Sequence, residues 1–577
     1  MTAKLKDTLS VWAVPCSLAF LASFSVMAVE IVAGRMLARH VGASLYLWTS
    51  VIGVILGGMA VGNMLGGWIA DRFDARNALA VVFLVSAVVL SALPYLNEAL
   101  AIWSQWEADA AKVANSWPVS IATHAFLAFF LPAMSLGLIS PIVTKDALEK
   151  GFATGRTVGN IYAWGALGSI LGTLCTGFLL IKTLGTVAVV FSVAAMLGIA
   201  GVLVQPRRSV RLLLVSWPVV IGCIVGYTFY KHPSFRRQWG WAGGKQMAKE
   251  IPVLPLLYEK ESEYSFIKVI EGVSRKRVVR FLWLDNLVNA ICVPSNPTEM
   301  HYDYEKIPAS LTVRFGQNKS RLRGLFIGGG GYVFPRFFQQ RWPQGLAVVS
   351  EIDPAVTDAN FQALELKPEQ ARIMESSSLD TQLDRAGKPG ATNPIQIYHK
   401  DARIHIEDLL KQKRTAKVFE PFDFAYNDAF KGYQPAYQLC TKEFYEKVRE
   451  LLVPETGMYC QNVFDIYDSG RFIGALYNTL REVFPKVYIL CCNPDGPSTD
   501  PYQRDTFLVV GAFQDLDLRE LGSRKGELAF AGSLLTQEHL KILEKRSRGV
   551  VLTDNFCPVE NLLEEALKRR EPAGYRR

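Results

Sequence analysis

Long apolar segments in the first 230 residues constrain the fold of this chain more than any other feature of its sequence. Each segment is long enough to cross a lipid bilayer as a helix. The seven segments are residues 11–34, 46–69, 78–96, 119–143, 158–181, 185–204 and 212–230. The first has no cleavage site of small residues after a short core, so we expect it to be retained. The sequence therefore predicts a seven-helix transmembrane domain over residues 1–232, with the lipid bilayer as its partner.

Two of these segments contain glycines four residues apart, among them Gly53 and Gly57 in the second and Gly168 and Gly172 in the fifth. Small residues at this spacing allow helices to pack closely within a bilayer. The first segment also contains an acid, Glu30. An intramembrane acid indicates either a function or a nearby partner. Together these features favour transport as one alternative role for the membrane half.

The distribution of lysine and arginine in the short loops places the N-terminus inside the cell. An odd number of spans then places the soluble half on the outer face of the inner (plasma) membrane. Three cations just after the seventh segment, Lys231, Arg236 and Arg237, favour the inner face instead. The sidedness predicted from charge is therefore the outer face, with the inner face as its alternative.

Charge and cysteine usage argue against two classes of function. The formal charge of +9 forms no basic run of the kind that binds nucleic acid, so we expect no nucleic-acid partner. The nine cysteines show neither a CxxC pair nor a metal-ligand spacing. We therefore expect no metal.

The soluble half is organised around a glycine-rich turn. An apolar run at 325–327 leads into four glycines at 328–331, and a segment of helical character follows at 332–341. A second apolar run, 346–349, leads to Glu351. This order predicts a strand, a tight turn, a helix and a second strand, with glycines that let a ligand approach the backbone closely. An acid about 20 residues after the glycines suits the two hydroxyls of a ribose.

Two further apolar runs end in acids. Residues 395–398 precede Asp401, and residues 422–426 precede Asp428. The carboxyl ends of parallel strands meet at one edge of a sheet, where ligands bind. We therefore expect three carboxylates and the glycine turn around one crevice. The alternative for each acid is that it only caps the helix that follows.

Apolar runs and helical segments continue to alternate to the end of the soluble half, which predicts an α/β sheet with helices on both faces. The further helices are expected at 441–452 and 469–483, and the further strands at 457–463, 487–491 and 506–510. Strand and turn patterns at 256–290 precede the sheet. We therefore expect a small N-terminal β-subdomain over residues 250–310 and a nucleoside-binding domain over residues 311–577.

Several blocks of the soluble half resemble those of the spermidine synthases, which are polyamine aminopropyltransferases, and they occur in that family's order. The blocks are Tyr258-Glu259, Ser262-Glu263-Tyr264, Leu284-Asp285-Asn286, Tyr302-Asp303-Tyr304-Glu305, Ile327 to Gly331, Glu351-Ile352-Asp353-Pro354, Asp401-Ala402-Arg403, Asp428-Ala429-Phe430 and Thr441-Lys442-Glu443-Phe444-Tyr445. With its apolar half, the chain resembles the bacterial group in which a membrane domain is fused to a spermidine synthase-like domain. Residues 132–141, 159–172 and 552–560 fit that group. The resemblance implies an α/β class I methyltransferase-like (Rossmann-like) fold for the soluble half.

The resemblance also implies a chemistry. The co-substrate would be decarboxylated S-adenosylmethionine, or S-adenosylmethionine itself, and the acceptor a small amine. Asp428 is the implied catalytic residue, which would orient the amine and accept its proton. The implied nucleoside-binding residues are Gly328, Gly329, Gly330, Glu351, Asp401 and Ala402, and the implied acceptor-binding residues are Tyr264, Asp303 and Tyr304. Core packing is the alternative role of the two tyrosines, and a homodimer is compatible with the family.

The part of the site that would hold amines departs from the family pattern. Spermidine synthases carry an acid directly after the three glycines, where this chain has Gly331, and a second acid in the catalytic block, where it has Lys431. These departures favour S-adenosylmethionine-dependent transfer to a different acceptor as one alternative. The other alternative is a ligand-sensing or transport module without catalysis.

Overall fold

In the computed structural model, the described residues are 2–41, 44–110, 117–150, 154–204, 220–222, 225, 255–285, 287–375, 392–416, 419–432, 434–500, 503–518 and 532–568. The chain divides into two compact units. The first comprises Met1–Val253 together with Glu261–Glu263, and the second comprises Leu254–Lys260 and Tyr264–Arg577. The finer boundaries at residues 232, 250 and 310 stay predictions.

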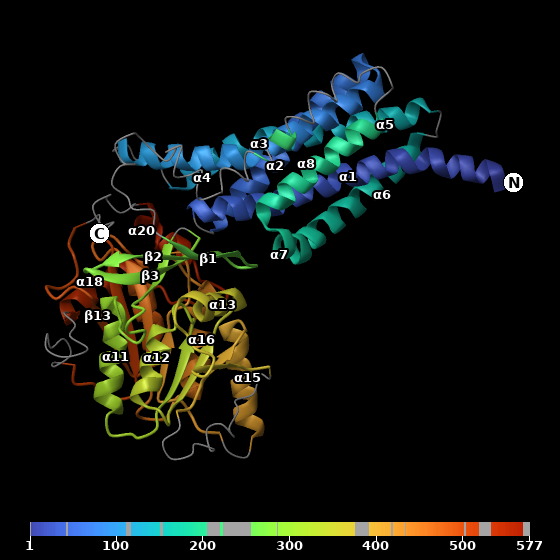
Figure 1. Ribbon diagram of the computed structural model, residues 1–577. Helices are drawn as coiled ribbons and strands as arrows, with labels where there is room; N and C mark the ends of the chain where they lie inside the picture. Colours follow the sequence, from blue (N-terminus) through green and yellow to red (C-terminus); the bar gives the residue numbers. More distant parts are fainter. Residues whose placement is uncertain are drawn as a thin grey trace. The chain divides into compact units, whose positions relative to one another are not determined.

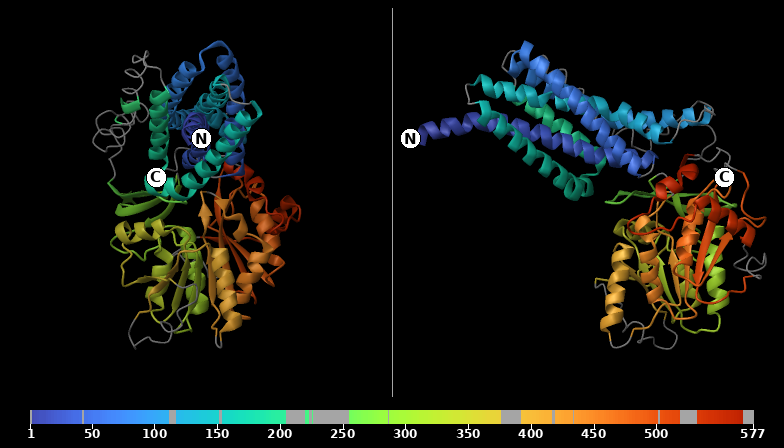
Figure 2. Two further views of the ribbon diagram at one scale, coloured as in Figure 1. Left: turned by 90° about the vertical axis from the view of Figure 1, so that its right-hand side faces the viewer. Right: turned by 180° about the vertical axis from the view of Figure 1, so that it is seen from behind.

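The described residues of the first unit up to residue 204 are mainly helical, and Figure 2 shows these helices from two directions. The helices are α1 (Thr2–Val41), α2 (Leu45–Arg72), α3 (Ala75–Ala110), α4 (Trp117–Gly137), α5 (Ile139–Glu149), α6 (Thr154–Cys175), the π-helix η1 (Thr176–Leu180), α7 (Ile181–Leu184) and α8 (Thr186–Val204). Among the described residues, six helical stretches are long and apolar enough to cross a bilayer: Ala13–Ala38, Leu45–Arg72, Ala75–Leu100, Ile121–Glu149, Thr154–Leu184 and Thr186–Val204. They coincide with the first six predicted segments. The seventh, 212–230, lies outside the described residues except for 220–222 and 225.

Glycines bring pairs of these helices into close contact. A Cβ atom added to Gly62 or Gly66 of α2 would lie 2.3 and 2.5 Å from backbone oxygens of residues 134 and 138 on the α4–α5 side. A Cβ atom added to Gly168 or Gly172 of α6 would lie 2.2 and 2.6 Å from carbonyl oxygens of α1. Any side chain at these positions would push the helices apart, as the spacing predicts for Gly168 and Gly172. At Gly53 and Gly57, no described atom lies within 4 Å of an added Cβ atom, so the spacing does not mark a helix contact there.

The second unit begins with a four-stranded sheet in chain order. Its strands are β1 (Leu256–Glu261), β2 (Phe266–Ser274), β3 (Arg277–Leu284) and β4 (Leu287–Cys292). Strands β2, β3 and β4 pair antiparallel. The helix α13 (Pro354–Ala363) packs against this sheet through Ala355, Val356 and Ala359.

The larger sheet has nine strands in the order β15-β13-β14-β12-β9-β5-β6-β8-β7. They are β5 (Arg323–Ile327), β6 (Leu346–Ser350), β7 (Ala371–Ile373), β8 (Ile395–Tyr398), β9 (Phe424–Asn427), β12 (Met458–Asp465), β13 (Lys486–Cys491), β14 (Asp505–Ala512) and β15 (Ser533–Leu534). The neighbouring strands β7, β8, β6, β5, β9 and β12 are parallel to one another. Strand β14 lies between β12 and β13 and is antiparallel to both. A doubly wound sheet with one antiparallel insertion is the class I methyltransferase-like arrangement.

Helices cover both faces of this sheet (Figure 1). On one face lie α11 (Asp303–Gly316) and α12 (Val333–Arg341), whose apolar residues share a core with Phe326 and Val349. On the other face lie α15 (Ala402–Thr415), α16 (Lys442–Leu451), α17 (Phe472–Arg481) and α18 (Gln537–Ser547). The strands between them are buried on both sides, which explains their continuous apolar runs.

The connections place the predicted site at the point where the strand order reverses. From β5 the chain continues to β6 and then to the outermost strand β7, places β8 between them, and returns to β9 on the other side of β5. In open α/β sheets, ligands bind outside the carboxyl ends of the strands at such a switch point. The glycine turn follows β5 and Asp428 follows β9, so neighbouring strands deliver both to that edge.

Candidate active site

The turn after β5 needs its glycines. Gly328 has φ = +98° and Gly330 has φ = +48°, and Tyr332 continues in the left-handed region at φ = 52°. Residues other than glycine adopt this region at a cost. A Cβ atom on Gly328 would lie 2.9 Å from the carbonyl oxygen of Asp428. The glycine turn is therefore held directly against the end of β9.

Glu351, at the end of β6, holds the glycine turn from the other side. Its Oε2 accepts a hydrogen bond from the backbone N–H of Gly329 at 2.8 Å, and its Oε1 accepts one from the N–H of Asp353 at 2.9 Å. The side chain is only 7% exposed. Burial raises the pKa of Glu351 to about 7, against the opposing effect of the hydrogen bonds from Asp353 and Gly329. The predicted ribose acid thus lies beside the glycine loop and also fixes its conformation.

Two other acids at this edge cap helices. Asp401 precedes α15, and its Oδ1 accepts hydrogen bonds from the N–H groups of Arg403 at 2.8 Å and Ile404 at 3.3 Å. Asp353 caps α13 in the same way through the N–H of Ala355 at 2.9 Å. The alternative role, that of a helix cap, is therefore present at Asp401, and its implied role in nucleoside binding stays a prediction.

Asp428 follows β9 and makes no helix cap. Its Oδ1 accepts a hydrogen bond from Nδ2 of Asn462 at 2.8 Å, and its Oδ2 accepts one from the hydroxyl of Tyr304 at 3.4 Å. The side chain is accessible from the pocket, although protein surrounds it. Desolvation by that protein raises the pKa of Asp428 to about 6, and the two hydrogen bonds oppose the rise. A carboxylate with this pKa is mostly ionised at neutral pH and can accept a proton.

A pocket of about 640 Å³, part of it open to solvent, joins these groups. Its lining includes residues 328–331, Asp428, Tyr304 and Asn462. The glycine turn, the predicted catalytic acid and one predicted acceptor residue are thus brought together in one cavity.

The other predicted residues do not line this pocket. Glu351 lies behind the glycine turn, and Asp401 and Ala402 lie at the start of α15. Asp303 is exposed and pairs with Lys306 at 2.8 Å. Tyr264 is 36% exposed. Of the three predicted acceptor residues, the structure places only Tyr304 next to Asp428.

Asn462 is a site residue to which the sequence assigned no role. It lies in β12 and is 5% exposed. Its neighbour Gln461 is also buried. Two adjacent amides inside an otherwise apolar strand were the available signal, because buried polar groups require partners. The side-chain oxygen of Gln461 accepts a hydrogen bond from the hydroxyl of Tyr445 at 2.7 Å. Of the two amides, therefore, only Asn462 contributes to the pocket.

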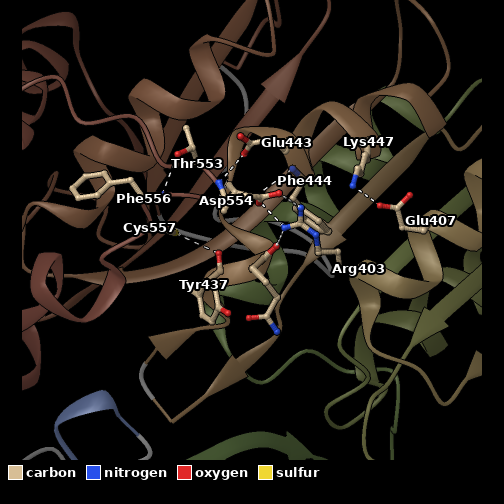
Figure 3. A network of polar contacts seen from close by, with 12 residues as sticks. Arg403, Glu407, Tyr437, Glu443, Phe444, Lys447, Thr553, Asp554, Phe556 and Cys557 are labelled. Atoms are coloured by element: carbon tan, nitrogen blue, oxygen red, sulfur yellow. Dashed lines mark hydrogen bonds and ion pairs between the residues drawn. The ribbon is translucent and has the colours of Figure 1, made fainter. Parts of the chain in front are cut away.

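A second polar network attaches the segment 552–560 to this edge of the domain (Figure 3). Asp554 accepts a hydrogen bond from Arg403 at 2.5 Å and one from the hydroxyl of Thr441 at 2.7 Å. Arg403 is in the first turn of α15, and Thr441 caps α16. The carbonyl oxygen of Leu552 accepts a hydrogen bond from Lys442 at 2.8 Å. The C-terminal segment thereby connects the starts of two helices that lie on one face of the sheet.

Solved structures similar to this chain include two spermidine synthases and a methyltransferase-like protein. A probable spermidine synthase from Corynebacterium glutamicum ATCC 13032 shares 18% identity, with 53% of this chain and 97% of that chain covered and a TM-score of 0.39. The spermidine synthase from Thermotoga maritima shares 16% identity, with 50% and 87% covered and a TM-score of 0.31. Human methyltransferase-like protein 13, in complex with SAH, shares 17% identity, with 43% and 93% covered and a TM-score of 0.28.

All three TM-scores are below 0.5, and the fold assignment rests on the strand order described above. No protein-family profile and no curated protein sequence matches the chain.

Proposed function

We propose that this protein is a membrane-anchored, aminopropyltransferase-like enzyme that transfers an aminopropyl group from decarboxylated S-adenosylmethionine to an amine. The observation that carries the proposal is the position of Asp428 in the pocket. Its backbone carbonyl group adjoins the glycine turn, and hydrogen bonds from Tyr304 and Asn462 orient its side-chain carboxylate. A carboxylate held in this way beside a nucleoside-type turn suits proton transfer from an amine.

The proposed reaction is a displacement at the carbon atom next to the sulfonium. The lone pair of the unprotonated amine forms a C–N bond, the C–S bond breaks, and its electron pair passes to sulfur. The nucleoside then leaves as the neutral thioether methylthioadenosine. The proton that the amine loses passes to Asp428 and from there to solvent. Tyr304 and Asn462 hold the carboxylate toward the amine.

The nucleoside would lie along the glycine turn. Gly328, Gly329 and Gly330 would face it with backbone atoms, Glu351 would accept hydrogen bonds from the ribose, and Asp401 with Ala402 would contact the adenine. The contact of Glu351 with Gly329 supports this arrangement, because it places a carboxylate at the turn itself. Tyr264 and Asp303 lie outside the pocket lining, so the proposed acceptor contacts rest on Tyr304.

One observation favours a second candidate, S-adenosylmethionine-dependent transfer to another acceptor. Gly331 stands where spermidine synthases have an acid, and a Cβ atom on Gly331 would lie 2.6 Å from the Cβ atom of Ala290. No side chain fits there without movement of β4. An acid is therefore missing from the sequence at this position, and the packing around Gly331 would have to shift to hold one.

Product analysis of the purified full-length protein in detergent tests both candidates. The protein is incubated with decarboxylated S-adenosylmethionine or S-adenosylmethionine and a panel of amines, and the products are identified by mass spectrometry. Release of methylthioadenosine together with an aminopropylated amine is the expected result. Release of S-adenosylhomocysteine would select the second candidate. Ligand binding without any turnover would contradict both and favour a sensing or transport role.

A further inference from the structure

A second acidic residue lines the pocket that contains Asp428. Glu305 lies in the first turn of α11 and lines this pocket. It is 9% exposed. A hydrogen bond with the backbone of Tyr302 holds the carboxyl group. Its Oε2 is buried and has no hydrogen-bond partner among the residues that the structure describes. A buried polar atom of this kind is rare unless a ligand or water satisfies it.

The lining of the pocket includes no lysine, arginine or histidine among the described residues. The cations that act on Glu305 are Arg336 and Lys306, and both are engaged elsewhere. Arg336 donates hydrogen bonds to the carbonyl oxygens of Tyr332, Leu364 and Gly331. Lys306 pairs with Asp303. The pocket therefore contains two acids and no cation to neutralise them.

Electrostatics agrees with this geometry. Burial, and secondarily the nearby charge of Asp428, raises the pKa of Glu305 to about 8. The opposing influences are the Tyr302 backbone, Arg336 and Lys306. A positively charged ligand between the two acids would favour the ionised form of both.

We propose that Glu305 binds a non-reacting primary ammonium group of a substrate while Asp428 acts on the amine that reacts. The inference rests on the proposed function, because it assigns a second cationic group to the substrates of that reaction. An ammonium group offers three N–H donors, and the unpartnered Oε2 of Glu305 is a matching acceptor. Glu305 thus determines specificity for a substrate with an ammonium group, and it belongs to the helix α11. The glycine turn has no side chain that could bind this ammonium group.

Two substrates could supply the ammonium group. The aminopropyl chain of decarboxylated S-adenosylmethionine ends in one, and a diamine acceptor carries one at its far end. In either case binding ionises Glu305 and releases its proton. Affinity for the ammonium-bearing ligand should therefore rise as the pH increases toward 8.

The test uses Glu305→Gln in the full-length protein, with Glu299→Gln as the matched control. The glutamine retains the size and hydrogen-bonding capacity of the side chain but not its charge. Glu299 lies shortly before α11 and pairs on the surface with Arg277 at 2.8 Å, outside the pocket. Calorimetry compares three ligands: decarboxylated S-adenosylmethionine, 5′-dimethylsulfonioadenosine, which keeps the sulfonium charge but has no ammonium group, and neutral methylthioadenosine. Steady-state kinetics compares 1,4-diaminobutane with butylamine.

Loss of a charge-assisted hydrogen bond should weaken the relevant interaction about tenfold or more. Weaker binding of decarboxylated S-adenosylmethionine, with 5′-dimethylsulfonioadenosine and methylthioadenosine unchanged, would assign the ammonium group to the donor. An equal loss for both sulfonium ligands would overturn the inference, because Glu305 would then act on the sulfonium. A raised KM for 1,4-diaminobutane, with butylamine unchanged, would assign it to the acceptor. Unchanged values for every ligand would overturn the inference, and so would an equal loss of methylthioadenosine affinity, because that would indicate a purely structural role.

The same measurements separate this inference from the proposed function. If the wild-type protein releases no methylthioadenosine but Glu305→Gln still loses affinity for the ammonium-bearing ligand, the reaction is wrong and the binding role stands. If the wild-type protein turns over and Glu305→Gln is indistinguishable from it, the reaction stands and the role of Glu305 is wrong.

Discussion

Glu351 should give the protein two opposite dependences on pH. Burial raises the pKa of Glu351 from an ordinary 4.5 to about 7, more than the hydrogen bonds from Asp353 and Gly329 lower it. A rise of about 2.5 corresponds to about 3 kcal/mol of preference for the protonated form. Since the side chain is only 7% exposed, solvent screening reduces this magnitude little.

The first dependence concerns the stability of the unliganded protein. Between pH 4.5 and 7 the folded state binds the proton more tightly than the unfolded state, so folding is favoured as the pH falls. The cost of the buried charge is fully present above pH 7 and is lost as the pH decreases toward 4.5. As the pH falls from 8 to 5 and Glu351 becomes protonated, the free energy of unfolding should therefore rise by up to about 3 kcal/mol. In Glu351→Gln this contribution should disappear.

The second dependence concerns the binding of nucleosides. Ribose hydroxyls donate hydrogen bonds, and the carboxylate accepts them better than the protonated acid does. Affinity for methylthioadenosine should therefore decrease below pH 7, by at most tenfold for each pH unit. Glu351→Gln should bind it more than about tenfold more weakly and without this pH dependence. The protein is then least stable in the pH range in which it binds its ligand most tightly, which is expected when a buried charge contacts the ligand.

Calorimetric titration with methylthioadenosine and thermal unfolding, both from pH 5 to 8.5, test these two dependences on the full-length protein in detergent. Glu369→Gln, which changes an exposed acid, is the control. Methylthioadenosine affinity that stays constant across pH 7 in the wild type, and is unaltered in Glu351→Gln, would refute the proposed contact with the ribose. Glu351 would then serve only to hold the glycine turn.

Three further predictions follow from the pocket and from the membrane half. Asp428→Asn should retain methylthioadenosine binding while turnover, measured by product release, falls about 10²-fold or more; normal turnover would show that Asp428 is not the base. Gly331→Ala should lower the free energy of unfolding by about 1–3 kcal/mol because its Cβ atom would overlap that of Ala290, and an unaltered thermal midpoint would contradict the packing argument. If the soluble unit lies outside, an impermeant maleimide should label Ala416→Cys in intact cells of a strain whose native cysteines are removed; labelling only after permeabilisation would place the unit inside, where sulfonium nucleosides are made.

The elements around the site could be predicted because their signals are local. The apolar run before Gly328, the helical segment after it and the run before Glu351 form β5, α12 and β6, with boundaries that differ by only one or two residues. Each of these signals depends on a few adjacent residues. The expectation that the four strand ends share one edge also holds, since β9, β5, β6 and β8 are parallel neighbours.

The roles of individual acids could not be predicted in the same way. Asp401 and Asp428 both follow an apolar run, yet Asp401 caps a helix and Asp428 is held by two side chains in the pocket. Position after a strand is the same for both, so the sequence pattern does not distinguish them. The difference arises from what the rest of the fold brings near each carboxylate.

Residues close together in the sequence were enough to predict the six helical stretches of the described residues that could cross a bilayer, the parallel strands β5, β6, β8, β9 and β12, and the turn that requires glycine, but not the short edge strand β7. These elements follow from length, hydrophobicity and backbone sterics within short windows. Only the tertiary structure decided which groups share the pocket. Tyr304 reaches Asp428 across 124 positions of the chain, and Asn462 reaches it across 34. Glu305 has an unpartnered oxygen only because folding buries it and engages Arg336 and Lys306 elsewhere. Such contacts depend on how strands and helices pack, and no local pattern of residues records that packing.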